Sequence, residues 1–332
     1  MRTWKKALAL GGVVGMLALG ATGTAVANEK IYTGGKTGSY FTTFGPLLKE
    51  VLTKQFFKYE LATSAGSGEN IKQVMTTPSA VALVQSDVLA QEVAANPDVG
   101  NKITVIRSDV AKECLFAVTS HANADRLKTW GDVLGFARRL KVVTGAADSG
   151  SATTLRFLQT IDEALKDATV INAVDIDKAI ETVVAGQADI GFFVAFADTK
   201  NPRFKMINDK KLSFIPVVDR AMLRQQIKDT QVYVAQEVKV TSADIVHWRG
   251  VNKITTACVP IAYVTGNPDQ LTGTAQADSK DLIQKVRSAE LKQLQPKEPW
   301  FKQMIDDTVA ASGAGLEGLL KTVDDAAKQI RK

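Results

Sequence analysis

Short apolar runs alternate along the chain with longer stretches whose apolar residues recur at helical spacing. From Phe44 to Leu52, apolar residues stand at i, i+3, i+4, i+7 and i+8, the spacing of an amphipathic helix. Strands are predicted at 31–32, 59–62, 81–84, 103–106, 114–119, 140–144, 170–174 and 190–194, with helices at 152–165 and 176–185 between the later ones. This alternation favours an α/β fold with mostly parallel sheets flanked by helices, and the pattern from Asp278 onward, including 299–309 and 315–330, predicts a helical C-terminal region.

The first 27 residues have the pattern of a secretory signal peptide. Arg2, Lys5 and Lys6 precede an uncharged run at 7–21, and small residues follow it. A membrane anchor is the alternative, but the run is rich in Gly and Ala and short for a bilayer span. We therefore expect cleavage before Asn28 and a mature protein free in the periplasm.

Size and charge narrow the class of protein further. Cleavage would leave about 305 residues, which is enough for two domains, and would lower the formal net charge from +6 to +3. The chain has 45% hydrophobic and 23% charged residues, as ordinary soluble domains do. A nucleic-acid partner is not expected at this modest charge.

Loops rich in glycine and hydroxyl side chains follow several predicted strands. They are TGGKTGSY at 33–40, SAGSGEN at 64–70, QSD at 85–87 and GAADSGSATT at 145–154. Open α/β sheets place ligands at the carboxyl ends of their strands, and a glycine corner before a helix offers unpaired backbone N–H groups to an anion. In the last loop Ser149 or Ser151 would cap a helix starting near Ala152, which leaves the N–H groups of 150–153 for a carboxylate or phosphate; an ordinary helix cap is the alternative.

The first loop does not match either common nucleotide motif. Lys36 precedes Gly38, whereas a Walker A lysine follows its last glycine, and the spacing G-x-G-x-x-G is absent. The remaining interpretation is a cradle for a small ligand, with Thr37 and Ser39 as hydroxyls, Tyr40 as a wall and Lys36 as a charge partner.

Catalytic and metal-binding patterns are also missing from the sequence. His121 and His247 are the two histidines, and neither stands beside a glycine-rich loop or in a metal-ligand spacing. No G-x-S-x-G elbow is present, and Glu69 with Asp87 is better explained by helix capping or loop ordering than by a carboxylate pair. We expect no enzyme, no metal and no cofactor.

Two cysteines, Cys114 and Cys258, lie 144 positions apart. The expected compartment permits disulfides, but the spacing alone does not show pairing. Two small buried apolar side chains and a long-range bridge remain equally open.

The order of the loop motifs resembles the TAXI family of solute-binding proteins, which serve tripartite ATP-independent periplasmic (TRAP) transporters. The family patterns T-G-G-x-x-G-x-Y, S-x-G-S-x-E-N, Q-S-D and G-x-x-x-S-G-S/T match 33–40, 64–70, 85–87 and 145–151. The chain departs from the family at TTPSAVALVQSD (76–87), at VAFADTKNP (194–202) and at Lys36, which replaces a residue that is commonly small or neutral. The resemblance covers nearly all of the mature chain.

The resemblance implies two α/β lobes joined by a hinge that the chain crosses twice. Lobe 1 would comprise 28–115 and 260–332, and lobe 2 would comprise 116–259, with crossings near 114–119 and 254–264. Cys114 and Cys258 then fall at the two crossings, where a disulfide would staple the hinge.

The resemblance further implies that a small carboxylate, such as glutamate, glutamine or a dicarboxylic acid, is enclosed between the lobes of a monomeric protein and passed to a TRAP permease. Alternatives are the binding component of an ATP-driven (ABC) importer and a ligand-sensing partner of a membrane receptor kinase. The expected ligand-binding residues are Thr33, Lys36, Gly38, Ser39, Tyr40, Ser67, Asn70 and Gln85 on one side, and Ser149, Ser151, Thr153 and Phe193 on the other.

Overall fold

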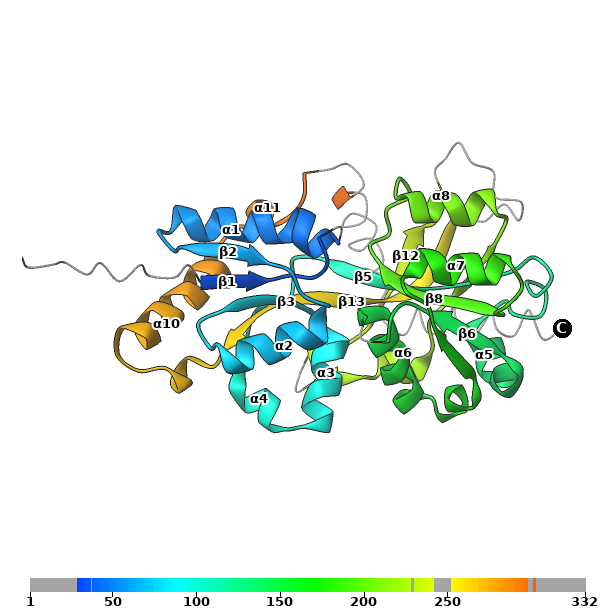
Figure 1. Ribbon diagram of the computed structural model, residues 1–332, viewed down its shortest axis with the longest axis horizontal. Coiled ribbons are helices and arrows are strands. Elements are labelled where there is room, and N and C mark those ends of the chain that lie inside the picture. The colour runs from blue at the N-terminus through cyan, green and yellow to red at the C-terminus, as the bar shows by residue number, and fades with distance from the viewer. Residues whose placement is uncertain are drawn as a thin grey trace, which may run out of the picture.

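The computed structural model describes residues 29–36, 38–147, 149–227, 230–241, 252–297 and 301–302. Two lobes lie side by side along the long axis of the molecule, and strands β5 (Lys112–Thr119) and β13 (Lys253–Gly266) run between them (Figure 1). The predicted signal peptide, Thr37, His247 and most of the predicted helical segments at 299–309 and 315–330 lie outside the described residues.

Lobe 1 is built around a parallel core of three strands. β1 (Glu29–Tyr32) lies between β2 (Tyr59–Ala62) and β3 (Val81–Gln85) and is parallel to both. β4 (Ile103–Arg107) and the second half of β13 complete the sheet. The helical segments of this lobe are η1 (Tyr40–Phe44), α1 (Gly45–Lys54), α2 (Ser67–Thr76), α3 (Ser86–Ala95), α4 (Asp98–Lys102), η4 (Pro268–Gln270), α10 (Gly273–Ser288) and α11 (Leu291–Leu294).

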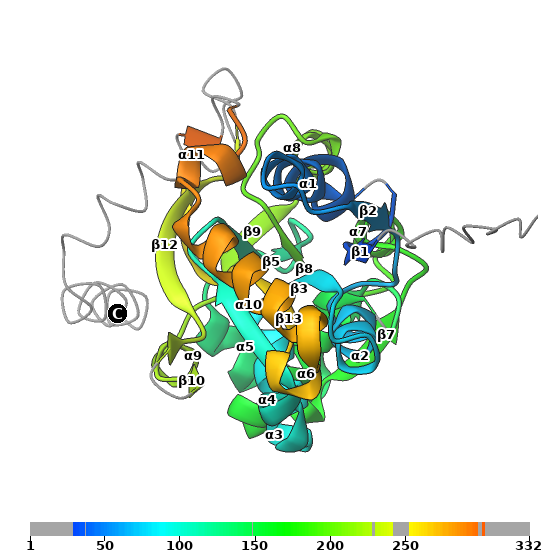
Figure 2. The same cartoon turned by 90° about the vertical axis from the view of Figure 1, so that its left-hand side faces the viewer.

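The helices of lobe 1 surround its strands. Viewed toward this lobe, α1, α2 and α10 lie around β1, β3 and β13 (Figure 2). The apolar spacing of α1 places Leu48, Val51 and Leu52 in the core, where they are nearly inaccessible to solvent. All five residues of β3 are buried, as expected for a strand covered on both faces.

Lobe 2 has a similar parallel arrangement, in which β6 (Lys141–Thr144) is the central strand. β6 is parallel to β7 (Thr169–Asn172) and to β8 (Ile190–Ala195), and β8 pairs with β5. β9 (Ser213–Pro216) and β12 (Val234–Lys239) pair with β5 and β13. The remaining elements of this lobe are α5 (Trp130–Phe136), η2 (Ala137–Arg139), α6 (Gly150–Ile161), η3 (Glu163–Asp167), α7 (Ile176–Val184), α8 (Pro202–Asp209), α9 (Arg220–Leu223) and the small hairpin of β10 (Gln226–Ile227) and β11 (Thr230–Gln231).

One correction concerns strand direction, because the sheet is mixed rather than mostly parallel. The strands follow the order β2-β1-β3-β13-β5-β8-β6-β7, with β4, β9 and β12 as further partners. Strands joined by helical crossovers within a lobe are parallel, whereas β5 and β13 run antiparallel to every strand they pair with. The two crossing strands carry the chain between lobes in opposite directions, and this fixes their orientation.

The predicted α/β fold with two lobes is confirmed. Each predicted strand run overlaps a strand of the structure, whereas β9, β12 and the full 14 residues of β13 were not predicted as strands. The exact lobe boundaries, 28–115 with 260–332 and 116–259, stay a prediction. Within the described ranges no helix combines the length and the apolar composition needed to cross a bilayer.

Candidate functional site

A cavity of about 220 Å³ lies where the glycine-rich loops of the two lobes meet. Its walls come from the loop after β1, the start of α2, the end of β3, the start of α6, and strands β5 and β8. The lining residues are Thr33, Gly34, Gly35, Gly38, Ser39, Tyr40, Ala65, Gly66, Ser67, Gln85, Glu113, Ser149, Gly150, Ser151 and Val194.

The loop after β1 forms one wall of the cavity. Thr33 Oγ1 donates a hydrogen bond to the carbonyl oxygen of Ala62 (2.9 Å), which holds the loop against β2. A turn closed by the N–H of Gly38 and the carbonyl of Gly35 (2.8 Å) leads into Ser39 and Tyr40. Both Ser39 and Tyr40 line the cavity.

The start of α2 is held by contacts behind the cavity. Gly66 has φ of 135°, a conformation that side chains other than glycine rarely adopt. Ser67 Oγ accepts a hydrogen bond from the backbone N–H of Gln85 (3.0 Å). Asn70 Nδ2 donates to the carbonyl oxygens of Thr33 (2.6 Å) and Leu83 (2.7 Å), so Asn70 ties the wall to β3 from inside the lobe.

The start of α6 forms the facing wall. Ser149 Oγ caps the helix by accepting from the N–H of Ala152 (3.2 Å), and Ser151 Oγ accepts from the N–H of Val194 (3.0 Å). A Cβ atom at Gly150 would overlap Oε1 of Gln85, so the Gln85 side chain packs directly against the start of α6 and would have to move if any larger residue stood there. No acceptor within the described residues binds the N–H groups of Gly150 and Ser151.

Eight of the twelve predicted ligand-binding residues line the cavity. They are Thr33, Gly38, Ser39, Tyr40, Ser67, Gln85, Ser149 and Ser151. Their place at the cavity could be expected because glycine corners and helix starts are local features that a short stretch of sequence encodes, while their contact with a ligand stays a prediction.

The other four predicted residues are placed elsewhere. Lys36 is exposed outside the lining, and Asn70 is buried behind it. Thr153 Oγ1 accepts from Arg156 Nη2 (2.8 Å). Phe193 stacks on Phe116 in the core of lobe 2 with ring centroids 5.3 Å apart, because neighbouring strand residues face opposite sides and the next residue, Val194, faces the cavity.

The sequence interpretation missed Glu113, which lines the cavity from β5. Its Oε2 atom accepts a hydrogen bond from the hydroxyl of Tyr40 (2.9 Å). Burial raises the pKa of Glu113 to about 7; the hydrogen bond from Tyr40 lowers it in part and the charge of Asp87 raises it. The feature of the sequence that could have indicated Glu113 is a carboxylate near the start of a crossing strand whose later residues are all buried.

Asp87 joins the two lobes beside the cavity. Its carboxylate is fully buried, and Oδ2 accepts from Thr154 Oγ1 of α6 (2.6 Å) and from the hydroxyl of Tyr233 (2.9 Å). Burial raises the pKa of Asp87, while these two hydrogen bonds lower it. Glu69, the other predicted carboxylate, accepts from the N–H of Ala65 (2.8 Å) and so orders its own loop.

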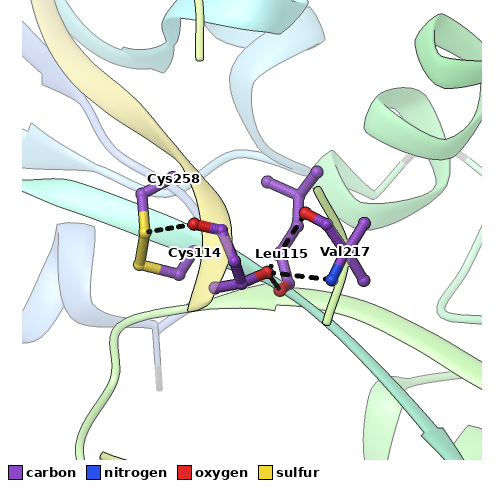
Figure 3. The surroundings of a disulfide bond; sticks show 5 residues. Cys114, Leu115, Val217 and Cys258 are labelled. Carbon is purple, nitrogen blue, oxygen red and sulfur yellow. Dashed lines mark hydrogen bonds between the residues drawn. A yellow bond between two sulfur atoms is a disulfide. The ribbon is translucent and has the colours of Figure 1, made fainter. Parts of the chain in front are cut away.

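A disulfide joins the two crossing strands. Cys114 of β5 and Cys258 of β13 are directly opposite in the antiparallel register, with an S–S distance of 2.02 Å (Figure 3). Beside it, Thr256 Oγ1 donates to the carbonyl oxygens of Leu115 and Val217, which ties β13 to β5 and to the segment that follows β9. Because Glu113 precedes Cys114, this cross-linked crossing also positions the cavity carboxylate.

Comparisons with known proteins place most of the chain in one family model. Residues 31–267 match the NMT1-like family, a span that contains every cavity-lining residue and both crossing strands. No curated protein matches the chain.

Several solved structures have a similar chain course. MatC from Rhodopseudomonas palustris with bound malate is 12% identical, with 91% of this chain and 97% of that chain covered and a TM-score of 0.46. A protein described as a periplasmic transporter is 16% identical, with 84% and 86% covered and a TM-score of 0.48. The amino acid ABC transporter substrate-binding protein AbpA from Streptococcus pneumoniae, bound to L-arginine, is 10% identical, with 86% and 95% covered and a TM-score of 0.46.

Proposed function

The chain belongs to the NMT1-like family, and from this premise we propose that it is a periplasmic solute-binding protein that encloses a small carboxylate between its lobes and delivers it to a membrane transporter. The observation that carries the proposal is one cavity lined by loops of both lobes. Binding is its task rather than catalysis, and the signal peptide predicted at 1–27 provides its export.

The cavity suits a compact ligand with an anionic group. Its volume of about 220 Å³ is below the ~300–1,000 Å³ of sites for drug-sized molecules. The unpaired N–H groups of Gly150 and Ser151 begin a helix of 12 residues, whose N-terminus favours a carboxylate. The hydroxyl of Ser39 adds a polar contact from the opposite wall.

Capture works because the ligand contacts both lobes. A ligand shifts an equilibrium between open and closed states only through its different affinity for the two. In this structure the lobes already touch, since Gln85 lies against Gly150 and Asp87 binds Thr154. A bound carboxylate adds contacts that exist only when the walls face each other, so it stabilises the closed form.

Delivery to a TRAP-type permease, by a monomer of the TAXI type, is the finer part of the proposal. Its support is the order of the four motifs at 33–40, 64–70, 85–87 and 145–151. Uptake in membrane vesicles tests it: a TRAP carrier depends on an ion gradient and continues without ATP. Uptake that requires ATP hydrolysis would instead indicate an ABC importer.

Filling the cavity should weaken capture without disturbing the fold. Gly34 lines the cavity, and a Cβ atom added there meets nothing within 4 Å, so Gly34→Leu directs its side chain into open space. Overpacking a site costs about 1–3 kcal/mol, which corresponds to an affinity loss of roughly 10- to 100-fold. Native mass spectrometry of the purified protein identifies the ligand, and calorimetric titration then measures the loss.

The matched control is Gly135→Leu. Gly135 lies on α5 outside the cavity, and a Cβ atom there also meets nothing within 4 Å. This variant should bind like the wild type. Equal affinities of the wild type and Gly34→Leu would show that the ligand binds elsewhere and would refute the proposed site.

A further inference from the structure

Building on the proposed function, we propose that Glu113 binds a protonated nitrogen of the ligand, so that the protein selects an amino acid over a dicarboxylic acid. The amino acid would place its ammonium group at Glu113 and its carboxylate at the start of α6. Glu113 would then determine specificity between the two ligand classes that the loop motifs leave open.

Glu113 is placed to contact a ligand in the cavity. Its side chain lines the cavity, and Oε2 accepts from the hydroxyl of Tyr40 at 2.9 Å. The second carboxylate oxygen, Oε1, makes no hydrogen bond to the described residues. A carboxylate that keeps an unused acceptor at a cavity wall can receive a hydrogen bond from a ligand donor.

The charge around the cavity favours a cation beside Glu113. No lysine, arginine or histidine is among its described lining residues, so no side chain there neutralises Glu113. Asp87 adds negative charge nearby. Lys112 precedes Glu113 on β5 but is not part of the lining, and Lys36 is exposed outside it. A ligand carboxylate next to Glu113 would be repelled, whereas an ammonium group would be attracted.

The cavity has two poles of opposite charge. The unpaired N–H groups of Gly150 and Ser151 provide a positive pole on the lobe 2 wall, and Glu113 provides a negative pole on the crossing strand. Both border one cavity of about 220 Å³. An α-amino acid carries its opposite charges close together and matches this arrangement, whereas a dicarboxylate matches only one pole.

The protonation of Glu113 makes the two ligand classes distinguishable. Its pKa near 7, raised mainly by burial, leaves the carboxyl partly protonated in the empty protein at neutral pH. An ammonium ligand favours the ionised form, so its binding releases a proton and tightens as pH rises toward 7. A dicarboxylate needs the protonated form, so its binding weakens over the same range.

The experiment compares ligand pairs that differ only in the ammonium group. L-glutamate with glutarate, and L-alanine with propionate, are titrated into the wild type and Glu113→Gln by calorimetry. We expect the wild type to bind at least one amino acid roughly 10- to 100-fold more tightly than its partner acid. This ratio corresponds to the free energy of a hydrogen bond to a charged group. Glu113→Gln, which still accepts from Tyr40, should lose most of that preference.

A second measurement needs no variant. Affinity of the wild type for the amino acid should tighten by up to about tenfold per pH unit below 7 and level off above it, with proton release detected in buffers of different ionisation enthalpy. Glutarate and propionate each binding as tightly as their partner amino acids, with Gly34→Leu weakening that binding, would overturn the role of Glu113 and leave the proposed function standing. Absence of binding by every member of both pairs would overturn both.

Discussion

Replacing Cys114 and Cys258 together by alanine should lower the free energy of unfolding by about 4 kcal/mol. The bridge closes a loop of 144 positions, and in the chain-entropy model such a long cross-link removes much of the freedom of the unfolded chain. Both sulfur atoms are buried and pair β5 with β13 inside the sheet that both lobes share. The loss should therefore affect the whole molecule rather than one loop.

Urea unfolding followed by circular dichroism measures this effect. Wild-type protein should lose a similar amount when a reductant is added, whereas the double alanine variant should not respond to it. Thiol titration of denatured, unreduced wild type should find no free cysteine in the pair. Two reactive thiols, or a variant as stable as the oxidised wild type, would rule out the structural role of the bridge.

Replacing Tyr233 by phenylalanine should destabilise the closed molecule by roughly 2–3 kcal/mol. The hydroxyl of Tyr233 donates to the fully buried carboxylate of Asp87, which joins α3 of lobe 1 to α6 of lobe 2. Removing a donor from a buried charged acceptor leaves a desolvated charge with fewer partners. Because Thr154 and Tyr233 both belong to lobe 2, the variant should also spend more time open, which small-angle scattering detects as a larger radius of gyration.

Tyr263→Phe is the matched control. The hydroxyl of Tyr263 is buried on β13 and has no hydrogen-bond partner among the described residues, so its removal should leave stability unchanged or raise it slightly. Equal losses in the two variants would indicate a general packing effect and not a role of Asp87.

The pH dependence of Tyr233→Phe follows from its effect on Asp87. The hydrogen bond from Tyr233 lowers the pKa of Asp87, so its loss raises that pKa in the folded protein. The deficit in stability should be complete where the carboxyl is ionised, and it should shrink as falling pH protonates it. A deficit that grows on acidification would contradict the assignment.

The candidate site was predictable from sequence where its geometry is local. The residues 33–40 combine a strand end, glycines and a helical turn, and the residues 149–151 combine a cap with a helix start. Such corners need particular residue types at fixed spacing, so they can be recognised without knowing their neighbours. It was harder to predict which side chains of β8 face the cavity, because Phe193 and Val194 are both apolar and only packing decides which one faces the core.

Periodicity and loop chemistry by themselves determined that this chain forms α/β units with glycine-rich corners at strand ends. The tertiary structure decided which corners share a cavity, that Tyr40 meets Glu113 across 73 positions, and that Asp87 meets Tyr233 across 146. It also decided the mixed direction of the sheet, through the antiparallel crossings β5 and β13. The physical reason is that local spacing sets only the backbone conformation. The burial that shifts the pKa values of the site and brings its walls together arises only when distant segments exclude water together.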